Sequence, residues 1–302
     1  MKKEIYETLC QICGSDQVFC EESMSRHTTF RTGGPADILV TPKAEQISEI
    51  LALCKKEQIP WTVIGNGSNL LVGDGGIRGI VMEIGKQMAE ISIEGTKITA
   101  GAGAMLSAIA SKAAAQELTG LEFASGIPGS LGGAVVMNAG AYGGELKDVL
   151  TEATVLTPEG TFLTLPVSEL DLSYRHSIIP ERGYLVVSAV LELHPGKAEE
   201  IRAVMEDLKE KRVSKQPLEY PSAGSTFKRP EGYFAGKLIQ DAGLRGFQVG
   251  GAQVSEKHCG FVINRDHATS ADICNLMDQV SEIVFEKFGV RLEAEVKKIG
   301  EF

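Results

Sequence analysis

Two glycine-rich segments of the sequence have the composition of phosphate-binding loops. Gly65-Asn66-Gly67-Ser68-Asn69 follows an apolar run, and residues 125–133 read SGIPGSLGG. Because glycine has no Cβ, the backbone N–H groups of such loops can approach an anion without obstruction. The first segment lacks the third glycine of G-x-G-x-x-G and by itself is more often a tight turn than a ligand site. Two such loops, with a guanidinium offered upstream by Arg31-Thr32-Gly33-Gly34, can hold the two phosphates of a dinucleotide, so together they predict a bound pyrophosphate.

Three polar residues outside these loops could take part in catalysis. Arg175, in Tyr174-Arg175-His176, could hold an anion or stabilise a developing negative charge, although most arginines are surface ion-pair partners. Ser225 lies in the glycine turn AGSTFKRP (223–230) beside two cations, which suits either a proton donor or an ordinary capped turn. Glu295 lies in LEAEV (292–296). Strand alternation alone puts Glu293 and Glu295 on one face and predicts that both are exposed to solvent.

Several other chemistries find no support in the sequence. The five histidines show no HExxH or paired metal-ligand spacing, so no metal is expected. Neither a G-x-S-x-G element nor a G-x-x-x-x-G-K-[ST] P-loop occurs. Cys10 and Cys13 form a C-x-x-C, but they lie in a predicted amphipathic helix without a second pair. Packing or solvent-facing thiols are therefore favoured over zinc or redox chemistry.

The elements that must position these residues mix strands with helices. The chain opens in the order strand (37–40), helix (43–58), strand (61–64) and glycine loop, which is typical of an α/β arrangement. Pro195-Gly196 and a charged helix at 197–213 are expected to connect it to a second domain. Further strands are predicted at 79–84, 89–93, 96–100, 153–157, 161–165, 184–193, 249–254, 261–264 and 290–297, and further helices at 105–116, 232–242 and 270–288.

Length and composition restrict the class of protein. The chain has 302 residues, enough for roughly two domains, and 43% hydrophobic residues with 34 glycines indicate a globular protein. A net charge of −10 argues against a broad nucleic-acid-binding face and leaves a local anion pocket open. No stretch approaches the roughly 18 apolar residues that span a bilayer, and the first residues lack an apolar signal region. With six scattered cysteines, we expect a soluble, unexported protein with reduced thiols.

Six motifs resemble, in order and spacing, those of the UDP-N-acetylenolpyruvoylglucosamine reductases (UDP-N-acetylmuramate dehydrogenases) of peptidoglycan synthesis. They are HTTFRTGGPA (27–36), IGNGSNLLV (64–72), GIPGSLGGAVVMNAGAYGGE (126–145), SYRHS (173–177), AGSTFKRP (223–230) and LEAEV (292–296). The resemblance covers nearly the whole chain. It implies an α+β protein with a FAD-binding fold of the vanillyl-alcohol-oxidase (PCMH) type and a C-terminal α+β substrate domain. Residues 132–149 resemble the subgroup that lacks an inserted tyrosine-bearing loop, which would leave the substrate cleft more open.

The resemblance also implies an activity. It is that of a bacterial cytoplasmic flavoenzyme in which NADPH, through non-covalent FAD, reduces the enolpyruvyl group of UDP-N-acetylglucosamine enolpyruvate to give UDP-N-acetylmuramate. The product serves cell-wall biogenesis, and hence cell shape, the cell cycle and division. Residues 1–200 would form the FAD-binding region, two α+β subdomains with a core at about 31–196. Residues 201–302 would form the substrate-binding domain, with the last strand returning to the FAD domain. We expect a monomer with no nucleic-acid or membrane partner.

The resemblance assigns roles to individual residues. Arg175 and Glu295 would form an electrostatic and proton-handling pair, and Ser225 would donate a proton to the substrate. Lys215 and Lys228 would bind substrate. Arg229 stands where many members have Asn, which leaves a substrate contact there open. The FAD contacts implied are Arg31, Thr32, Gly33, Gly65, Asn66, Gly67, Ser68, Asn69, Ser125, Gly126, Pro128, Gly129, Gly132, Gly133 and Asn138.

Two other classes of function stay open at this point. A flavin-dependent alcohol or sugar oxidase of the same fold would need a base for proton abstraction and often a covalent flavin tether. Release of the yellow colour on acid precipitation separates it from a non-covalent flavoprotein. A nucleotide-binding regulator would bind FAD or a UDP-sugar without oxidising NADPH.

Overall fold

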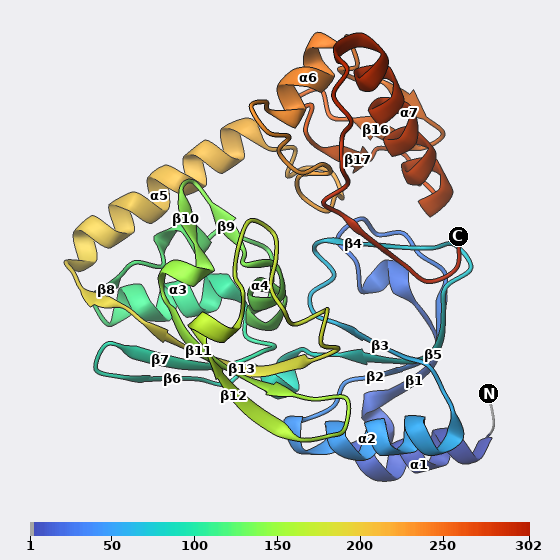
Figure 1. The fold of residues 1–302 in the computed structure, drawn as a ribbon, viewed down its shortest axis with the longest axis vertical. Coiled ribbons are helices and arrows are strands. Elements are labelled where there is room, and N and C mark those ends of the chain that lie inside the picture. Colours follow the sequence, from blue (N-terminus) through green and yellow to red (C-terminus); the bar gives the residue numbers. More distant parts are fainter. Residues whose placement is uncertain (1–2) are drawn as a thin grey trace. The chain divides into compact units, whose positions relative to one another are not determined.

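The computed structural model describes residues 3–302, in which helices and strands are mixed along the chain (Figure 1). The chain divides into two compact units. Unit 1 takes in the chain up to residue 20 together with residues 38–66 and 79–212, and unit 2 consists of residues 21–37, 67–78 and 213–302. The last boundary between the units falls after residue 212, whereas the sequence predicted a division after residue 200. The two short N-terminal segments of unit 2 have no counterpart in the prediction.

A four-stranded sheet occupies the N-terminal part of the chain, with the order β1-β2-β5-β3. The chain passes between the units within β1, β2 and β5. β3 pairs with β5 in parallel, with Trp61 opposite Ile80. Helix α2 buries Ile47, Ile50 and Leu51 at helical spacing and packs against α1. The bounds are α1 Lys3–Cys13, β1 Val18–Ser23, β2 Pro35–Val40, α2 Ala44–Glu57, β3 Trp61–Ile64 and β5 Ile77–Glu83.

A five-stranded antiparallel sheet forms the other sheet of unit 1, with the order β12-β11-β13-β7-β6. The predicted hairpin around Pro158-Glu159-Gly160 is confirmed, because Leu156 pairs with Phe162 across that turn. β13 buries alternate residues toward its end, which fits the strand predicted over 184–193. The bounds are β6 Ile91–Glu94, β7 Lys97–Gly101, β11 Leu150–Leu156, β12 Phe162–Pro166 and β13 Leu185–Glu192.

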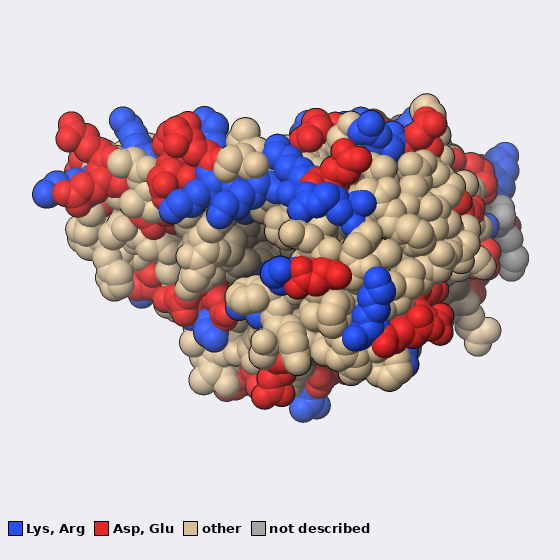
Figure 2. Space-filling model, turned by 90° about the horizontal axis from the view of Figure 1, so that it is seen from above, with Lys and Arg blue, Asp and Glu red and all other residues tan. Residues whose placement is uncertain are grey.

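Helices and short strand pairs complete unit 1. α4 packs against β13, and the long helix α5 buries only Ile201 of its 18 residues. Lysine, arginine and carboxylate side chains mix on the surface (Figure 2), in keeping with such a charged helix. The helices are α3 Leu106–Ala115, α4 Leu131–Met137 and α5 Ala198–Lys215, and the short strands are β8 Leu118–Thr119, β9 Gly140–Ala141, β10 Gly144–Glu145 and β14 His194–Pro195.

Unit 2 has its own core, in which α7 packs against the antiparallel strands β15, β16 and β17. The strand predicted over 249–254 is a hairpin, because the chain turns at Gly250-Gly251. The strand predicted over 290–297 is wrong for most of its length: only its end belongs to β18, which pairs in parallel with β4. The bounds are β4 Leu70–Val72, α6 Ala235–Asp241, β15 Gln248–Val249, β16 Ala252–Val254, β17 Val262–Asn264, α7 Ser270–Phe288 and β18 Lys297–Ile299.

Short 3-10 turns connect these elements, at Ser15–Gln17, Met24–Arg26, Lys86–Met88, Glu122–Ala124, Leu146–Asp148 and Val167–Glu169. Among the helices of residues 3–302, none is long and apolar enough to cross a membrane.

Candidate active site

The loop that follows β3 has backbone donors that the protein does not use. Within residues 3–302, the N–H groups of Gly65, Asn66, Gly67 and Ser68 donate no hydrogen bond. Four successive free N–H groups can bind an anion such as a phosphate. This is the arrangement that the glycines of the segment predict.

The second glycine loop lies against the first within unit 1. Asn66 Nδ2 donates a hydrogen bond to the Pro128 carbonyl oxygen at 2.7 Å. A Cβ on Gly65 would lie 2.5 Å from Ser130 Oγ, so the glycine lets the Ser130 hydroxyl lie close to the first loop. In the described part of the chain, the N–H groups of Gly129 and Ser130 also donate no hydrogen bond. Within unit 1, the structure therefore brings the free N–H groups of Gly65 and Asn66 to the same region as those of Gly129 and Ser130.

A guanidinium that sequence reasoning missed packs against the second loop. A Cβ built on Gly126 would lie 2.7 Å from Arg212 Nε. The guanidinium carbon of Arg212 lies 5.8 Å from the centre of the Tyr142 ring. Burial lowers the pKa of Arg212, yet a guanidinium stays charged at neutral pH. In the sequence Arg212 is one of many charged residues of α5, so no pattern singles it out.

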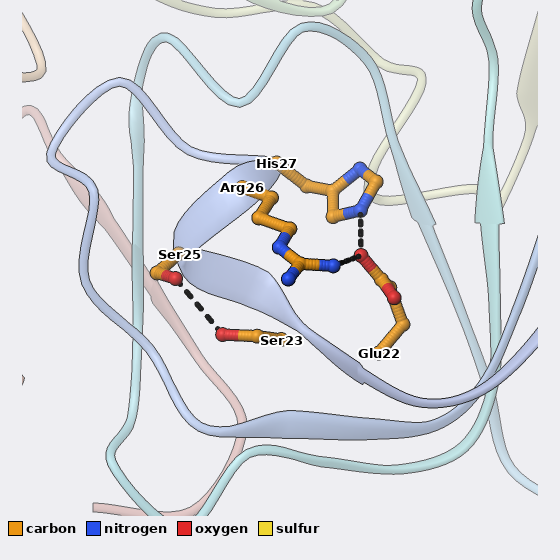
Figure 3. A network of polar contacts seen from close by, with 5 residues as sticks. All are labelled: Glu22, Ser23, Ser25, Arg26 and His27. Carbon is orange, nitrogen blue, oxygen red and sulfur yellow. Dashed lines mark hydrogen bonds and ion pairs between the residues drawn. The ribbon is translucent and has the colours of Figure 1, made fainter.

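The segment before the motif HTTFRTGG is held by a polar network in unit 2 (Figure 3). Glu22 Oε1 hydrogen-bonds with Arg26 Nη1 at 3.4 Å and with His27 Nε2 at 3.2 Å. The hydroxyls of Ser23 and Ser25 hydrogen-bond to each other at 2.8 Å. These contacts fix the entry to the loop that carries Arg31, Thr32 and Gly33.

That loop keeps two side-chain donors unused. Thr28 Oγ1 donates to the Thr32 carbonyl oxygen at 3.0 Å, which closes the loop. The hydroxyl oxygens of Thr29 and Thr32 are buried and have no hydrogen-bond partner. Since an unsatisfied buried hydroxyl is costly, these groups fit a bound polar ligand. Arg31 has a φ of 56°, an uncommon conformation that recurs at ligand sites.

The predicted catalytic arginine lies at the tip of a tight turn in unit 1. Ser173 and His176 exchange backbone hydrogen bonds of 3.3 and 3.2 Å, with Tyr174 and Arg175 between them. Arg175 has a φ of 56°, at a turn position that normally favours glycine. Its Nη2 donates to the Gly140 carbonyl oxygen at 3.4 Å. The guanidinium is thus presented on a constrained turn.

Asn138 supports this turn. Its Nδ2 donates to the Ser173 carbonyl oxygen at 3.1 Å and to Glu145 Oε2 at 2.9 Å, and its Oδ1 accepts from the Lys147 N–H at 2.9 Å. A hydrogen bond from Lys147 lowers the pKa of the Glu145 carboxylate. The amide of Asn138 is therefore engaged with protein, and its contact with a cofactor stays a prediction.

Ser225 and Glu295 come together in unit 2 through Thr226, which lies between them. The Glu295 N–H donates to the Thr226 carbonyl oxygen at 2.9 Å. Gly224 has a φ of 73°, and the Ser225 side chain is exposed beyond it without a hydrogen bond to any described residue. Glu295 is 8% exposed, so the expectation from strand alternation is wrong for this residue. The reason is that residues 290–296 form no regular strand.

Glu295 is also tied to the first glycine loop. Asn69 Nδ2 donates to the Glu295 carbonyl oxygen at 3.0 Å, and the Lys297 N–H donates to the Asn69 carbonyl oxygen at 2.9 Å. Residues 226 positions apart in the sequence thus share one site in unit 2. Arg175 belongs to unit 1 and Ser225 and Glu295 to unit 2.

The predicted substrate-binding cations lie in unit 2. Lys228 pairs with the exposed carboxylate of Glu293, and the Arg229 guanidinium lies 4.4 Å from the centre of the Phe234 ring. Lys215 is the last residue of α5 and is exposed.

The cysteine thiols and groups of metal-ligating side chains are the remaining candidates for a reactive site. None of the six cysteines, all of which lie within residues 3–302, forms a disulfide. Burial raises the pKa of Cys13 and Cys54 to about 11, so their reactive thiolate forms are scarce at neutral pH. Residues 3–302 contain no group of three or more His, Cys, Asp or Glu side chains that could hold a metal ion.

Comparisons with known proteins show the family of the chain. Residues 216–299 match the C-terminal domain of UDP-N-acetylenolpyruvoylglucosamine reductase, and residues 36–166 match the FAD binding domain family. A reductase of this name from Agathobacter rectalis is 61% identical over 294 residues, which cover 93% of this chain and 94% of the relative. The reductase from Clostridioides difficile is 51% identical, with 99% of each chain covered.

Solved structures show the same likeness. The UDP-N-acetylenolpyruvylglucosamine reductase from Thermus caldophilus has a TM-score of 0.80 and 34% identity, covering 93% of this chain and 98% of its own. An alkyldihydroxyacetonephosphate synthase has a TM-score of 0.51 at 18% identity, covering 65% of this chain and 41% of its own, which shows a common fold and no more.

Proposed function

Because the chain belongs to the UDP-N-acetylenolpyruvoylglucosamine reductase family, we propose that Arg175, Ser225 and Glu295 are the residues with which it reduces its substrate. The chain is an oxidoreductase of peptidoglycan synthesis that uses FAD and NADPH to convert UDP-N-acetylglucosamine enolpyruvate into UDP-N-acetylmuramate. The family, the FAD-binding fold and the reaction expected from the sequence are confirmed. One observation supports the assignment of Ser225 and Glu295 to the same site. Thr226, the residue after Ser225, accepts a backbone hydrogen bond from the Glu295 N–H.

Unused hydrogen-bond donors occur among the residues predicted to contact FAD. Bound FAD supplies hydride transfer, from NADPH to the flavin and then to the methylene carbon of the enolpyruvyl group. We assign its diphosphate to the free N–H groups of Gly65–Ser68, Gly129 and Ser130, and a further contact to the unpartnered hydroxyl of Thr32. The same proposal takes in the other predicted FAD contacts, which are Arg31, Gly33, Asn69, Ser125, Gly126, Pro128, Gly132, Gly133 and Asn138.

Arg175 and Glu295 act on the charge that hydride addition creates. A hydride added to the methylene carbon leaves negative charge on the adjacent carbon and its carboxylate. The permanent charge of Arg175 stabilises this state, and its constrained turn holds the guanidinium in place in advance. Glu295, a largely buried carboxyl group, handles the proton and polarises the substrate carboxylate.

Ser225 completes the addition. Its exposed hydroxyl gives its proton to the carbanion-like carbon, so the O–H bond breaks as the new C–H bond forms, and water restores the hydroxyl. The absence of a hydrogen bond to any described residue leaves this hydroxyl free to turn toward the substrate. A serine is a weak acid, and this carbon is basic enough to accept its proton.

Lys215, Lys228 and Arg229 are proposed to bind the anionic nucleotide sugar. Lys228 is paired with Glu293 at the surface, and an exchange of this partner for a substrate phosphate costs little because exposed ion pairs are weak. Such local cations reconcile a net charge of −10 with an anionic substrate. We further propose that the enzyme works in the cytoplasm as a monomer.

Anaerobic stopped-flow absorbance of the purified holoenzyme tests the function. NADPH should bleach the bound flavin, and UDP-N-acetylglucosamine enolpyruvate should then restore its absorbance. Reoxidation by dioxygen but not by this substrate would indicate an oxidase. Flavin that NADPH fails to bleach would indicate a regulatory protein. Either outcome would contradict the proposed activity.

A further inference from the structure

His258 is linked to the turn that carries Ser225 through Gly260, which hydrogen-bonds to both His258 and Thr226. Its ring stacks edge-on against Phe261, with 5.0 Å between the ring centroids and 68° between the ring planes. A Cβ built on Gly236 or on Gly260 would lie 3.3 or 2.9 Å from His258 Cε1. Two glycines thus enclose one edge of the imidazole, and this enclosure fixes the ring.

The ring accepts a backbone hydrogen bond on this enclosed edge. The Gly260 N–H donates to His258 Nδ1 at 3.0 Å. A nitrogen that accepts must be unprotonated, so the imidazole is neutral and carries its proton on Nε2. If Nδ1 became protonated, its N–H would face the Gly260 N–H, and the hydrogen bond between them would be lost.

Gly260 connects the ring to both proposed catalytic residues. The Thr226 N–H donates to the Gly260 carbonyl oxygen at 2.9 Å, and the Thr226 carbonyl oxygen accepts from the Glu295 N–H at 2.9 Å. Thr226 Oγ1 accepts from the Val262 N–H at 2.8 Å, and Thr226 is fully buried. Ser225 is its neighbour in the chain. A shift of Gly260 would therefore move Ser225 and Glu295 together.

The charges around His258 favour the neutral ring. Burial lowers the pKa of His258 below its ordinary value of 6.5 against an opposing backbone hydrogen bond that raises it, and the cations Arg245 and Lys215 lower it further. From the adjoining α6, Gly236 carries no charge, and Lys237 pairs with Asp241. The ring thus keeps its acceptor at neutral pH and loses it only in acid.

We propose that His258 is a positioning residue of the reduction, which holds Ser225 and Glu295 in place through Gly260 and Thr226. The inference rests on the proposed roles of Ser225 and Glu295. It predicts that the second half-reaction, in which the enolpyruvyl substrate reoxidises the flavin, needs a neutral imidazole. The first half-reaction, in which NADPH bleaches the flavin, does not use Ser225. Its rate should therefore not depend on the protonation state of His258.

Two amide variants separate the functions of the two ring nitrogens. An asparagine oxygen can replace the Nδ1 acceptor, whereas a glutamine places its amide near Nε2. His258→Asn should keep reoxidation within about threefold of wild type at neutral pH and lose the acid limb that the wild-type rate shows below pH 6.5. His258→Gln should slow reoxidation by about 10- to 100-fold, the range expected for a misplaced catalytic group. Bleaching by NADPH should be unchanged in both.

Equal rates for the two variants, or a faster His258→Gln, would overturn the proposal. The wild-type holoenzyme gives an independent test that needs no variant to fold. Nitrogen-15 NMR of the ring should show the Nε2–H form, with a titration midpoint that coincides with the acid limb of the reoxidation rate. An Nδ1–H form, or a midpoint elsewhere, would also overturn it. Failure of the underlying assignment has a different signature, because Ser225→Ala would then reoxidise at the wild-type rate.

Discussion

Arg175 has a left-handed backbone conformation that most side chains avoid, with a φ of 56°. Such a conformation costs about 1 kcal/mol or more for a non-glycine residue. Arg175→Gly should therefore raise the free energy of unfolding by up to about 1 kcal/mol and lower kcat by at least about 100-fold. Urea unfolding and steady-state kinetics measure the two effects.

Gln58→Gly is the matched control for Arg175. Gln58 has a φ of 54° at the end of α2, where glycine is favoured, and it has no proposed role in the reaction. This variant should gain stability and keep its activity. A stable, fully active Arg175→Gly would remove the arginine from the mechanism.

Glu295 and Glu293 form a second matched pair. Glu295→Gln should lower kcat by about 100-fold or more while the protein retains FAD, because the carboxyl group is lost from the reacting centre. Glu293→Gln changes an exposed side chain and should stay close to wild type. Comparable losses in both variants would indicate a general effect on the surface of unit 2.

Individual site residues were predictable to different degrees. The glycines of residues 65–69 and 125–133 identified the two loops, because few other positions need so many small residues. Arg175, Ser225 and Glu295 could be named as candidates from their sequence context, but only the family resemblance assigned them roles, since each type is common at the surface. The burial of Glu295 followed from contacts with Thr226 and Asn69. No local pattern of residues encodes those contacts.

Glycines within one element differ in what they do. A Cβ on Gly132 would lie 2.9 Å from the Ala102 side chain, whereas a Cβ on Gly133 would meet only Ser130 Oγ at 3.9 Å. Gly133→Val should therefore leave the stability of the FAD-free protein within about 0.5 kcal/mol of wild type and weaken FAD binding. Gly132→Val should destabilise the protein itself.

Fluorescence titration of FAD and urea unfolding of the FAD-free protein test this pair. Unchanged FAD affinity in Gly133→Val would place the cofactor elsewhere on the molecule.

The start of α7 depends on a carboxylate at neutral pH. Asp272 Oδ2 accepts from the Thr269 N–H at 3.0 Å, and this hydrogen bond lowers the pKa of Asp272. A lowered folded-state pKa adds stability above the unfolded value, near pH 3.9, and loses it as the pH falls through the folded value. Asp272→Asn should thus cost about 1 kcal/mol at pH 7 and less in acid.

Urea unfolding at pH 7 and at about pH 3 measures the difference. Asp278→Asn, at an exposed position of the same helix, should change little at either pH. A deficit of Asp272→Asn that does not shrink in acid would show that the cap does not depend on its charge.

Helices and strands with a regular spacing of apolar residues were predictable from the sequence. Strands that pair with segments far away in the sequence were not. The helix predicted over 270–288 matches α7, because its apolar face and its capping residue are both local signals. β4 and β18 are three residues each. They pair in parallel across more than two hundred residues of sequence. Neither strand has a local signal that would reveal its partner.

At the scale of the whole molecule, unit 2 joins segments that the sequence keeps apart. Asp74 accepts hydrogen bonds from the N–H groups of Ser270 and Ala271 at 2.8 and 2.9 Å, which caps α7 from a loop near the first glycine segment. Asn264 Nδ2 donates to the Phe30 carbonyl oxygen at 3.0 Å. These contacts join residues on both sides of position 200, so a single division of the chain at that residue does not describe unit 2. The roles proposed for the two parts of the chain remain predictions.

The central claim is that Ser225 donates the proton in the second half-reaction, and Ser225→Ala tests it in the whole holoenzyme. Removal of the hydroxyl should leave FAD binding and flavin bleaching by NADPH unchanged, since no carbanion forms in that step. Reoxidation by UDP-N-acetylglucosamine enolpyruvate should slow by about 10²- to 10⁴-fold, the range for a lost general acid. Ser222→Ala, in the same loop, serves as the control and should behave as wild type.

Anaerobic stopped-flow absorbance of the two half-reactions is the decisive measurement. We predict a slow reoxidation after a normal bleaching step in Ser225→Ala and in neither Ser222→Ala nor wild type. Reoxidation at the wild-type rate, or equal slowing of both half-reactions, would contradict it.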